Sequence, residues 1–194
     1  MLVKDGAVIG SGWHKLAGDQ HAEVEAISSA EADVRGATAY VTLEPCSHEG
    51  RTGACCKVLA EAGISRVVAA MVDPFPEVAG KGFEYLRTAG IEVTTSLLED
   101  QARALNPGYV KRLEQGLPFV RCKLATSLDG RTALANGNSK WISGADARRD
   151  VQRLRARSSA IVTGIGTVLA DDPSLTVRAG ELDIASADLA LQRQ

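Results

Sequence analysis

Residues 40–56 read Tyr-Val-Thr-Leu-Glu-Pro-Cys-Ser-His-Glu-Gly-Arg-Thr-Gly-Ala-Cys-Cys. This stretch combines the end of a predicted strand, a polar loop and the start of a predicted helix, and it carries three of the four cysteines of the chain. Its β-branched and aromatic start is typical of a strand, and Pro45 ends the hydrogen-bond ladder. A helix is expected to begin at Cys55 and to end before Gly63, because glycine favours the position just past a helix. Cys46 and Cys55 therefore flank a polar loop between a buried strand and a helix.

A second motif, His21-Ala22-Glu23, lies upstream at the start of another predicted helix. One imidazole from His21 and two thiolates, from Cys46 and Cys55, supply three zinc ligands and leave the fourth position open for water, as a catalytic zinc requires. Zinc lowers the pKa of bound water from 15.7 to roughly 7, and that water needs a proton shuttle. Glu23 can reach it without being a ligand. His-x-Glu followed by Pro-Cys is the zinc deaminase pattern.

The loop between the two cysteines is longer than in that pattern. Eight residues separate Cys46 from Cys55, whereas two are usual. The extra residues include His48 and Arg51, whose side chains suit an anionic substrate. Solvent exposure of both residues is the ordinary alternative.

These motifs resemble the bifunctional riboflavin-biosynthesis deaminase-reductase family, RibD, and two later stretches resemble the start of that family's reductase domain. The later stretches are residues 123–132, Lys-Leu-Ala-Thr-Ser-Leu-Asp-Gly-Arg-Thr, and residues 167–178, Thr-Val-Leu-Ala-Asp-Asp-Pro-Ser-Leu-Thr-Val-Arg. The resemblance implies zinc-dependent deamination of 2,5-diamino-6-(5-phospho-D-ribosylamino)pyrimidin-4(3H)-one. It also implies NADPH-dependent reduction of 5-amino-6-(5-phosphoribosylamino)uracil to the ribitylamino product.

The resemblance also assigns roles to residues. It implies zinc ligation by His21, Cys46 and Cys55, catalysis by Glu23, substrate binding by His48, Arg51, Ser139, Arg155, Leu175 and Arg178, and NADPH binding by Ala125, Trp141, Thr167 and Asp171. Arginine forks suit a phosphate, and a tryptophan face suits a flat ring. Residues 148–157 carry five arginines, however, and such a helix is ordinarily a solvated face.

Alternating strand and helix patterns predict the architecture. A hairpin is expected over residues 2–10 with a turn at Asp5-Gly6, and parallel βαβ units should follow. We expect a three-layer α/β/α, cytidine-deaminase-like domain with a mostly parallel mixed sheet over residues 1–116. Residues 117–194 should form the N-terminal part of a dihydrofolate-reductase-like α/β domain, with strands at 119–124 and 160–164 and a helix at 145–157. Cys122 is expected in its core.

Composition limits the remaining possibilities. The 194 residues are 45% hydrophobic with a net charge of −2, so nothing indicates a nucleic-acid surface, and no apolar run is long enough for a membrane span. Without an export signal, the expected location is the cytoplasm, with reduced thiols.

The expected partner is a small molecule, the phosphoribosylaminopyrimidine substrate, and the chain could also form a homo-oligomer. The family has a helix and an Asn-Pro loop before the hairpin and a longer reductase half, so we expect truncation at both ends.

Three other interpretations stay open. Another nucleoside or base deaminase of the cytidine deaminase superfamily, acting on cytidine, guanine or tRNA adenosine, would share the zinc residues but usually keeps the short cysteine spacing. An inactive, zinc-stabilised scaffold is the second. A purely structural zinc knuckle is the third, although such a site normally shows four protein ligands.

Overall fold

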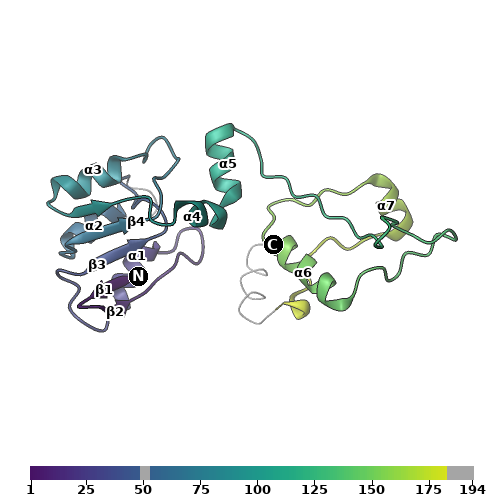
Figure 1. Cartoon of the computed structure of the whole chain (residues 1–194), viewed down its shortest axis with the longest axis horizontal. Helices are drawn as coiled ribbons and strands as arrows, with labels where there is room; N and C mark the ends of the chain where they lie inside the picture. The colour runs from purple at the N-terminus through teal and green to yellow at the C-terminus, as the bar shows by residue number, and fades with distance from the viewer. Residues whose placement is uncertain (49–52, 183–194) are drawn as a thin grey trace. The chain divides into compact units, whose positions relative to one another are not determined.

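The computed structural model describes residues 1–48 and 53–182 and divides into two compact units, Met1–Val120 and Arg121–Gln194. Figure 1 shows the helices and strands of each unit. The elements of the first unit are β1 (Leu2–Lys4), β2 (Ala7–Gly10), α1 (Ala22–Ser28), β3 (Thr38–Val41), α2 (Cys55–Glu61), β4 (Arg66–Ala69), α3 (Lys81–Thr88), β5 (Glu92–Thr94), α4 (Glu99–Leu105) and α5 (Pro107–Gln115).

A five-stranded mixed sheet organises the first unit, in the order β2-β1-β3-β4-β5. Strand β1 runs antiparallel to β2 and β3, whereas β3, β4 and β5 run parallel to one another. Asp5 and Gly6 join β1 to β2 with φ angles of 51° and 77°, the left-handed geometry that a two-residue hairpin turn requires. The predicted hairpin and the predicted mixed sheet are confirmed.

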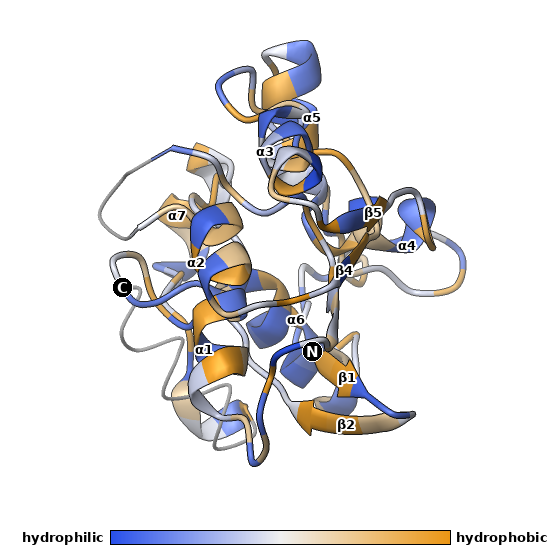
Figure 2. Cartoon of the chain, turned by 90° about the vertical axis from the view of Figure 1, so that its left-hand side faces the viewer, coloured by the Kyte–Doolittle hydropathy of each residue, from blue (hydrophilic) through white to orange (hydrophobic). Residues whose placement is uncertain are grey.

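The two faces of the sheet differ in what covers them. Val67 and Ala69 of β4 pack into the main core with residues of α1, α2 and α3, whereas the alternate residues Val68 and Ala70 line a cavity. Ala70 and Leu43 also contact a small second cluster, formed by Met71, Ala102 of α4 and Val110 of α5. Helices therefore lie against both faces, as expected for three layers. In Figure 2 the strands are largely hydrophobic.

The helical segment that follows β5 is divided in two. Helix α4 ends at Leu105, Asn106 has φ −127° and ψ 53°, and Pro107 then occupies the first turn of α5. Proline removes an N–H and disfavours a helical conformation in the residue before it, so the chain bends at this point.

The second unit contains α6 (Ala145–Ala156), α7 (Ile165–Asp171) and a short 3-10 helix η1 (Ala179–Glu181). The prediction of α6 is confirmed. The strands predicted over 119–124 and 160–164 are wrong for this structure, since no strand forms in the described residues of this unit. Val120 and Val162 are 76% and 91% exposed. In the part that the structure describes, neither segment has a neighbouring strand whose backbone groups could pair with its own, so no sheet forms to bury these side chains. Cys122 is likewise exposed and not in a core.

No helix in the described part of the chain is both long and apolar enough to cross a membrane.

Replacing Leu86 tests the main core. This side chain on α3 is completely buried, so Leu86→Ala should lower the free energy of unfolding of the first unit by about 2–5 kcal/mol. The matched substitution Leu117→Ala removes the same atoms from a side chain that is 55% exposed and should have little effect. Hydrogen exchange of the β4 amides measures both, and equal effects would contradict this assignment of the core.

Candidate metal centre

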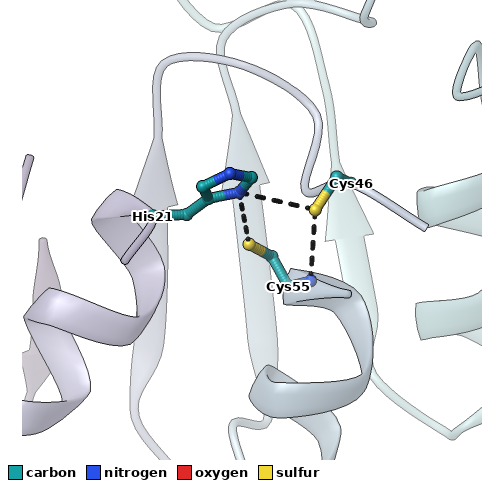
Figure 3. A group of neighbouring side chains, drawn as sticks. All are labelled: His21, Cys46 and Cys55. Carbon is teal, nitrogen blue, oxygen red and sulfur yellow. Dashed lines mark hydrogen bonds between the residues drawn. The ribbon is translucent and has the colours of Figure 1, made fainter. Parts of the chain in front are cut away.

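His21, Cys46 and Cys55 lie together although they are far apart in the sequence (Figure 3). Their ligand atoms are all within 4.8 Å of one another. The Nδ1 atom of His21 is 3.2 Å from the Sγ of Cys55 and 3.5 Å from the Sγ of Cys46. In the described chain these three side chains form the group of His, Cys, Asp and Glu residues best arranged to hold a metal ion.

Secondary structure places each of these side chains. His21 occupies the N-cap of α1 with extended backbone angles, and Cys55 is the first residue of α2. Cys46 follows β3, and it is joined to α2 at two points. Its carbonyl accepts the N–H of Cys56, and its Sγ accepts the N–H of Cys55 at 3.3 Å. Two helix starts and one strand end therefore meet at the same point.

The separations of the His21 nitrogen from the two sulfurs fit zinc. Bond lengths of about 2.3 Å to sulfur and 2.0–2.1 Å to nitrogen, at tetrahedral angles, separate ligand atoms by roughly 3.5–3.8 Å. The two nitrogen–sulfur distances lie within a few tenths of an ångström of that range. One imidazole and two thiols are also a donor set that zinc prefers, and three ligands leave one coordination position for a water molecule.

The two thiols share protons unequally when no metal is bound. The hydrogen bond with the Cys55 side chain, helped by the Cys55 N–H and by His21, lowers the pKa of Cys46 to about 5. The same hydrogen bond and burial raise the pKa of Cys55. Without a metal, the proton is therefore favoured on Cys55 over Cys46, and a bound cation would displace it.

Glu23 lies next to this group in the first turn of α1. Burial raises its pKa, and a hydrogen bond with the Cys55 side chain partly opposes that effect. A carboxyl group beside a metal centre is placed to accept a proton from a bound water and to return it.

A cavity of about 830 Å³ adjoins the centre, within the range of small-molecule sites. Its lining includes His21, Cys46 and Glu23. It also includes His14, whose ring contacts the His21 ring edge-on with the centroids 5.3 Å apart. His48, predicted to bind substrate, lies in the lining with its ring 6.2 Å from that of Phe75. Arg51 lies outside the described residues.

Sequence reasoning missed several residues of the cavity wall. Asp73 is buried, accepts the N–H of Phe75 and accepts a 2.7 Å hydrogen bond from the Tyr109 hydroxyl. The sequence position of Asp73 could have identified it. Asp73 follows β4, and the carboxyl ends of the neighbouring parallel strands β3 and β4 meet at one edge of the sheet, where functional residues are typically found.

In the second unit the structure brings together some of the predicted residues. Arg155 on α6 donates to the carbonyls of Ser174 and Thr176, which flank Leu175, and the N–H of Arg178 donates to Gln152 on the same helix. The Trp141 ring contacts the Arg148 guanidinium at 4.5 Å. The other predicted residues lie on α7 or in irregular segments, and they are Ala125, Ser139, Thr167 and Asp171.

Two family models match successive parts of the chain. The model of the cytidine and deoxycytidylate deaminase zinc-binding region matches residues 1–71, and that of the RibD C-terminal domain matches residues 118–190. Riboflavin biosynthesis protein RibD of Escherichia coli is 56% identical over 183 residues, which are 94% of this chain and 50% of the relative. The Haemophilus influenzae protein of that name is 58% identical over 178 residues, 92% of this chain and 48% of the relative.

Solved structures give the same result. Acinetobacter baumannii RibD has a TM-score of 0.88 at 53% identity, over 95% of this chain and 52% of the other. The diaminohydroxyphosphoribosylaminopyrimidine deaminase/5-amino-6-(5-phosphoribosylamino)uracil reductase of Thermotoga maritima has a TM-score of 0.85 at 42% identity, over 91% of this chain and 51% of the other. The chain spans about half the length of these relatives.

The raised pKa of Glu23 has a consequence for the metal-free chain. A carboxyl group whose pKa is higher in the folded state stabilises folding below its unfolded pKa of about 4.3, and that contribution is lost as pH rises through the folded value. Glu23→Gln stays neutral, so its stability relative to the unsubstituted chain should increase with pH across this interval. Urea midpoints in the presence of a chelator, from about pH 4 to about pH 8, measure the difference. A difference that is constant with pH would contradict the burial of this carboxyl group.

Proposed function

The chain belongs to the RibD family of riboflavin biosynthesis proteins, and on this premise we propose that its first unit is a zinc-dependent pyrimidine deaminase. The proposed reaction is hydrolysis of the exocyclic amine of 2,5-diamino-6-(5-phospho-D-ribosylamino)pyrimidin-4(3H)-one with release of ammonia. The single observation that supports it most is the convergence of His21, Cys46, Cys55 and Glu23 at the edge of one cavity.

We assign the metal ligands to His21, Cys46 and Cys55. Zinc held there would supply an activated water and a positive charge close to the ring carbon that is attacked. The Cys55 N–H holds the Cys46 sulfur, and the extended N-cap conformation of His21 directs its ring toward both sulfurs (Figure 3). The geometry of the ligands is thus prepared before a substrate binds.

Glu23 is the proposed proton carrier. Its carboxylate takes a proton from the water and gives it to the ring nitrogen of the substrate. It then takes the proton of the hydroxyl group added to the ring carbon and gives it to the departing amine as the carbonyl forms. The position of Glu23 supports this role, because it lines the cavity and its carboxyl group contacts the Cys55 side chain next to the proposed metal.

We further propose that the outer part of the cavity binds the phosphoribosyl group. His48 and Arg51 come from the long loop between the cysteines, and the aromatic contact between His48 and Phe75 supports a wall on that side. Asp73 and Tyr109 add polar groups nearby. Hydrogen-bond donors and a cationic side chain would suit a sugar phosphate, whereas a free base would leave them unused.

The second unit is proposed to contribute to the reductase reaction, and we place the start of the reductase domain at residue 117. Ser139, Arg155, Leu175 and Arg178 would contact the phosphoribosyl substrate, and Ala125, Trp141, Thr167 and Asp171 would contact NADPH. The grouping of Arg155 and Arg178 about α6 supports the first set. The exposed Trp141 ring, backed by Arg148, supports the second.

Glu23→Gln separates metal binding from chemistry. The purified chain should contain about one zinc, and the variant should keep it while losing ammonia release from the diaminopyrimidine phosphate by at least about 10²-fold, because the proton carrier is absent. Metal analysis measures the zinc content, and an ammonia assay measures the rate of deamination. As matched controls, Cys46→Ser should lose zinc, and Cys122→Ser, which changes an exposed thiol outside the cluster, should not. Loss of zinc in Glu23→Gln would overturn the assignment of Glu23.

The same assay with cytidine distinguishes the alternatives. Activity on cytidine alone would favour another deaminase of the superfamily. A zinc-loaded chain inactive on both compounds would favour a zinc-stabilised scaffold.

Binding of NADPH tests the proposal for the second unit. NADPH should bind saturably, and Trp141→Ala should weaken binding because the exposed ring is lost as a stacking surface. The fluorescence of NADPH on titration measures this. Trp13→Ala removes the other tryptophan, which lies in the first unit, and should leave binding unchanged. Absence of saturable binding to the unsubstituted chain would contradict the assignment of these residues to NADPH.

A further inference from the structure

Glu44 is a buried carboxylate two residues before the ligand Cys46, and the deaminase chemistry described above does not use it. It is 3% exposed. Its hydrogen-bond donors in the described part of the chain are all backbone N–H groups. Oε1 accepts from Gly82 at 2.9 Å and from Phe83 at 3.4 Å, and Oε2 accepts from Gly80 at 2.9 Å and from Asp73 at 3.2 Å.

These contacts make Glu44 the cap of α3 from a distant part of the sequence. The N-cap residue Gly80 has no capping side chain of its own. The first N–H groups of a helix have no partner within the helix, and its N-terminus carries a partial positive charge. A buried carboxylate is costly unless several donors satisfy it. Glu44 and the start of α3 therefore stabilise each other, which fixes the distance between them.

Gly82 shows how closely the two segments approach. A Cβ atom at this position would lie 2.1 Å from the Pro45 carbonyl oxygen and 3.1 Å from Oε1 of Glu44. Only glycine avoids this overlap with backbone. Pro45 is itself fully buried and directly precedes Cys46, so the chain leading to the sulfur has little freedom to shift.

The same carboxylate also reaches the cavity wall. It accepts the N–H of Asp73, whose side chain binds the Tyr109 hydroxyl and the Phe75 N–H. We propose that Glu44 is a positioning residue that holds Cys46 and the Asp73 wall of the cavity in a fixed relation, so that metal and substrate meet in the correct geometry. This inference rests on the proposed deaminase function.

Metal binding by the full chain tests the inference without relying on activity. Glu44→Gln keeps the shape of the side chain but sets an NH₂ group against backbone N–H donors. Gly82→Ala keeps the carboxylate and pushes α3 away from Pro45. Each should weaken zinc binding about 10–100-fold in chelator competition and change the visible absorption spectrum of bound Co²⁺, which depends on the arrangement of the sulfur ligands. Glu44→Asp, which retains the charge on a shorter stem, should recover part of the affinity.

Leu86→Ala is the control for a general loss of stability, since Leu86 lies on α3 but points into the main core. It should lower stability while the folded protein keeps its zinc affinity and Co²⁺ spectrum. The inference is overturned if Glu44→Gln and Gly82→Ala behave like Leu86→Ala, or if neither yields folded protein. If the unsubstituted chain binds neither metal, the metal centre itself fails, and that result is distinct from failure of Glu44 alone.

Discussion

Two sulfur atoms and one imidazole nitrogen held within 4.8 Å of one another are the constraint on which the first unit depends. Without a cation, the hydrogen bond between the two cysteine side chains lowers the pKa of Cys46 and, together with burial, raises that of Cys55. A divalent metal bound there would take the place of the proton held between the two sulfurs. The surrounding fold can be understood as a means of keeping three donors from separate segments at this spacing.

The topology of the sheet supplies that means. Strands β3 and β4 are parallel, so Cys46 and Asp73 leave the sheet at the same edge, and α1 and α2 begin there with His21 and Cys55. Functional groups at the carboxyl ends of parallel strands are typical of α/β proteins. The cavity is lined by Val68 and Ala70 and by the metal ligands His21 and Cys46, so it lies beside the metal centre.

Much of this arrangement could be predicted from local sequence signals. The Asp5-Gly6 turn, the helix starts at His21 and Cys55, and the clustering of three ligands follow from residue type and spacing. Glu44 could not be identified in this way, because its partners are backbone groups 29 to 39 residues away and leave no pattern of side chains. The strands predicted at 119–124 and 160–164 failed for a related reason: strand propensity requires a neighbouring strand, which composition does not reveal.

The break at Asn106 and Pro107 has a consequence for motion. Tyr109 lies beyond this break, on a helix that is held to the sheet mainly by the three-residue cluster of Met71, Ala102 and Val110 and by the bond to Asp73. Segments with few buried apolar contacts open locally at a lower free energy than the unit as a whole. Tyr109 lines the cavity, so transient separation of α5 would remove part of the cavity wall without unfolding the main core. The position of α5 would then govern access of a ligand to the cavity, whereas α1, α2 and the segment after β3 would govern the rigidity of the metal centre.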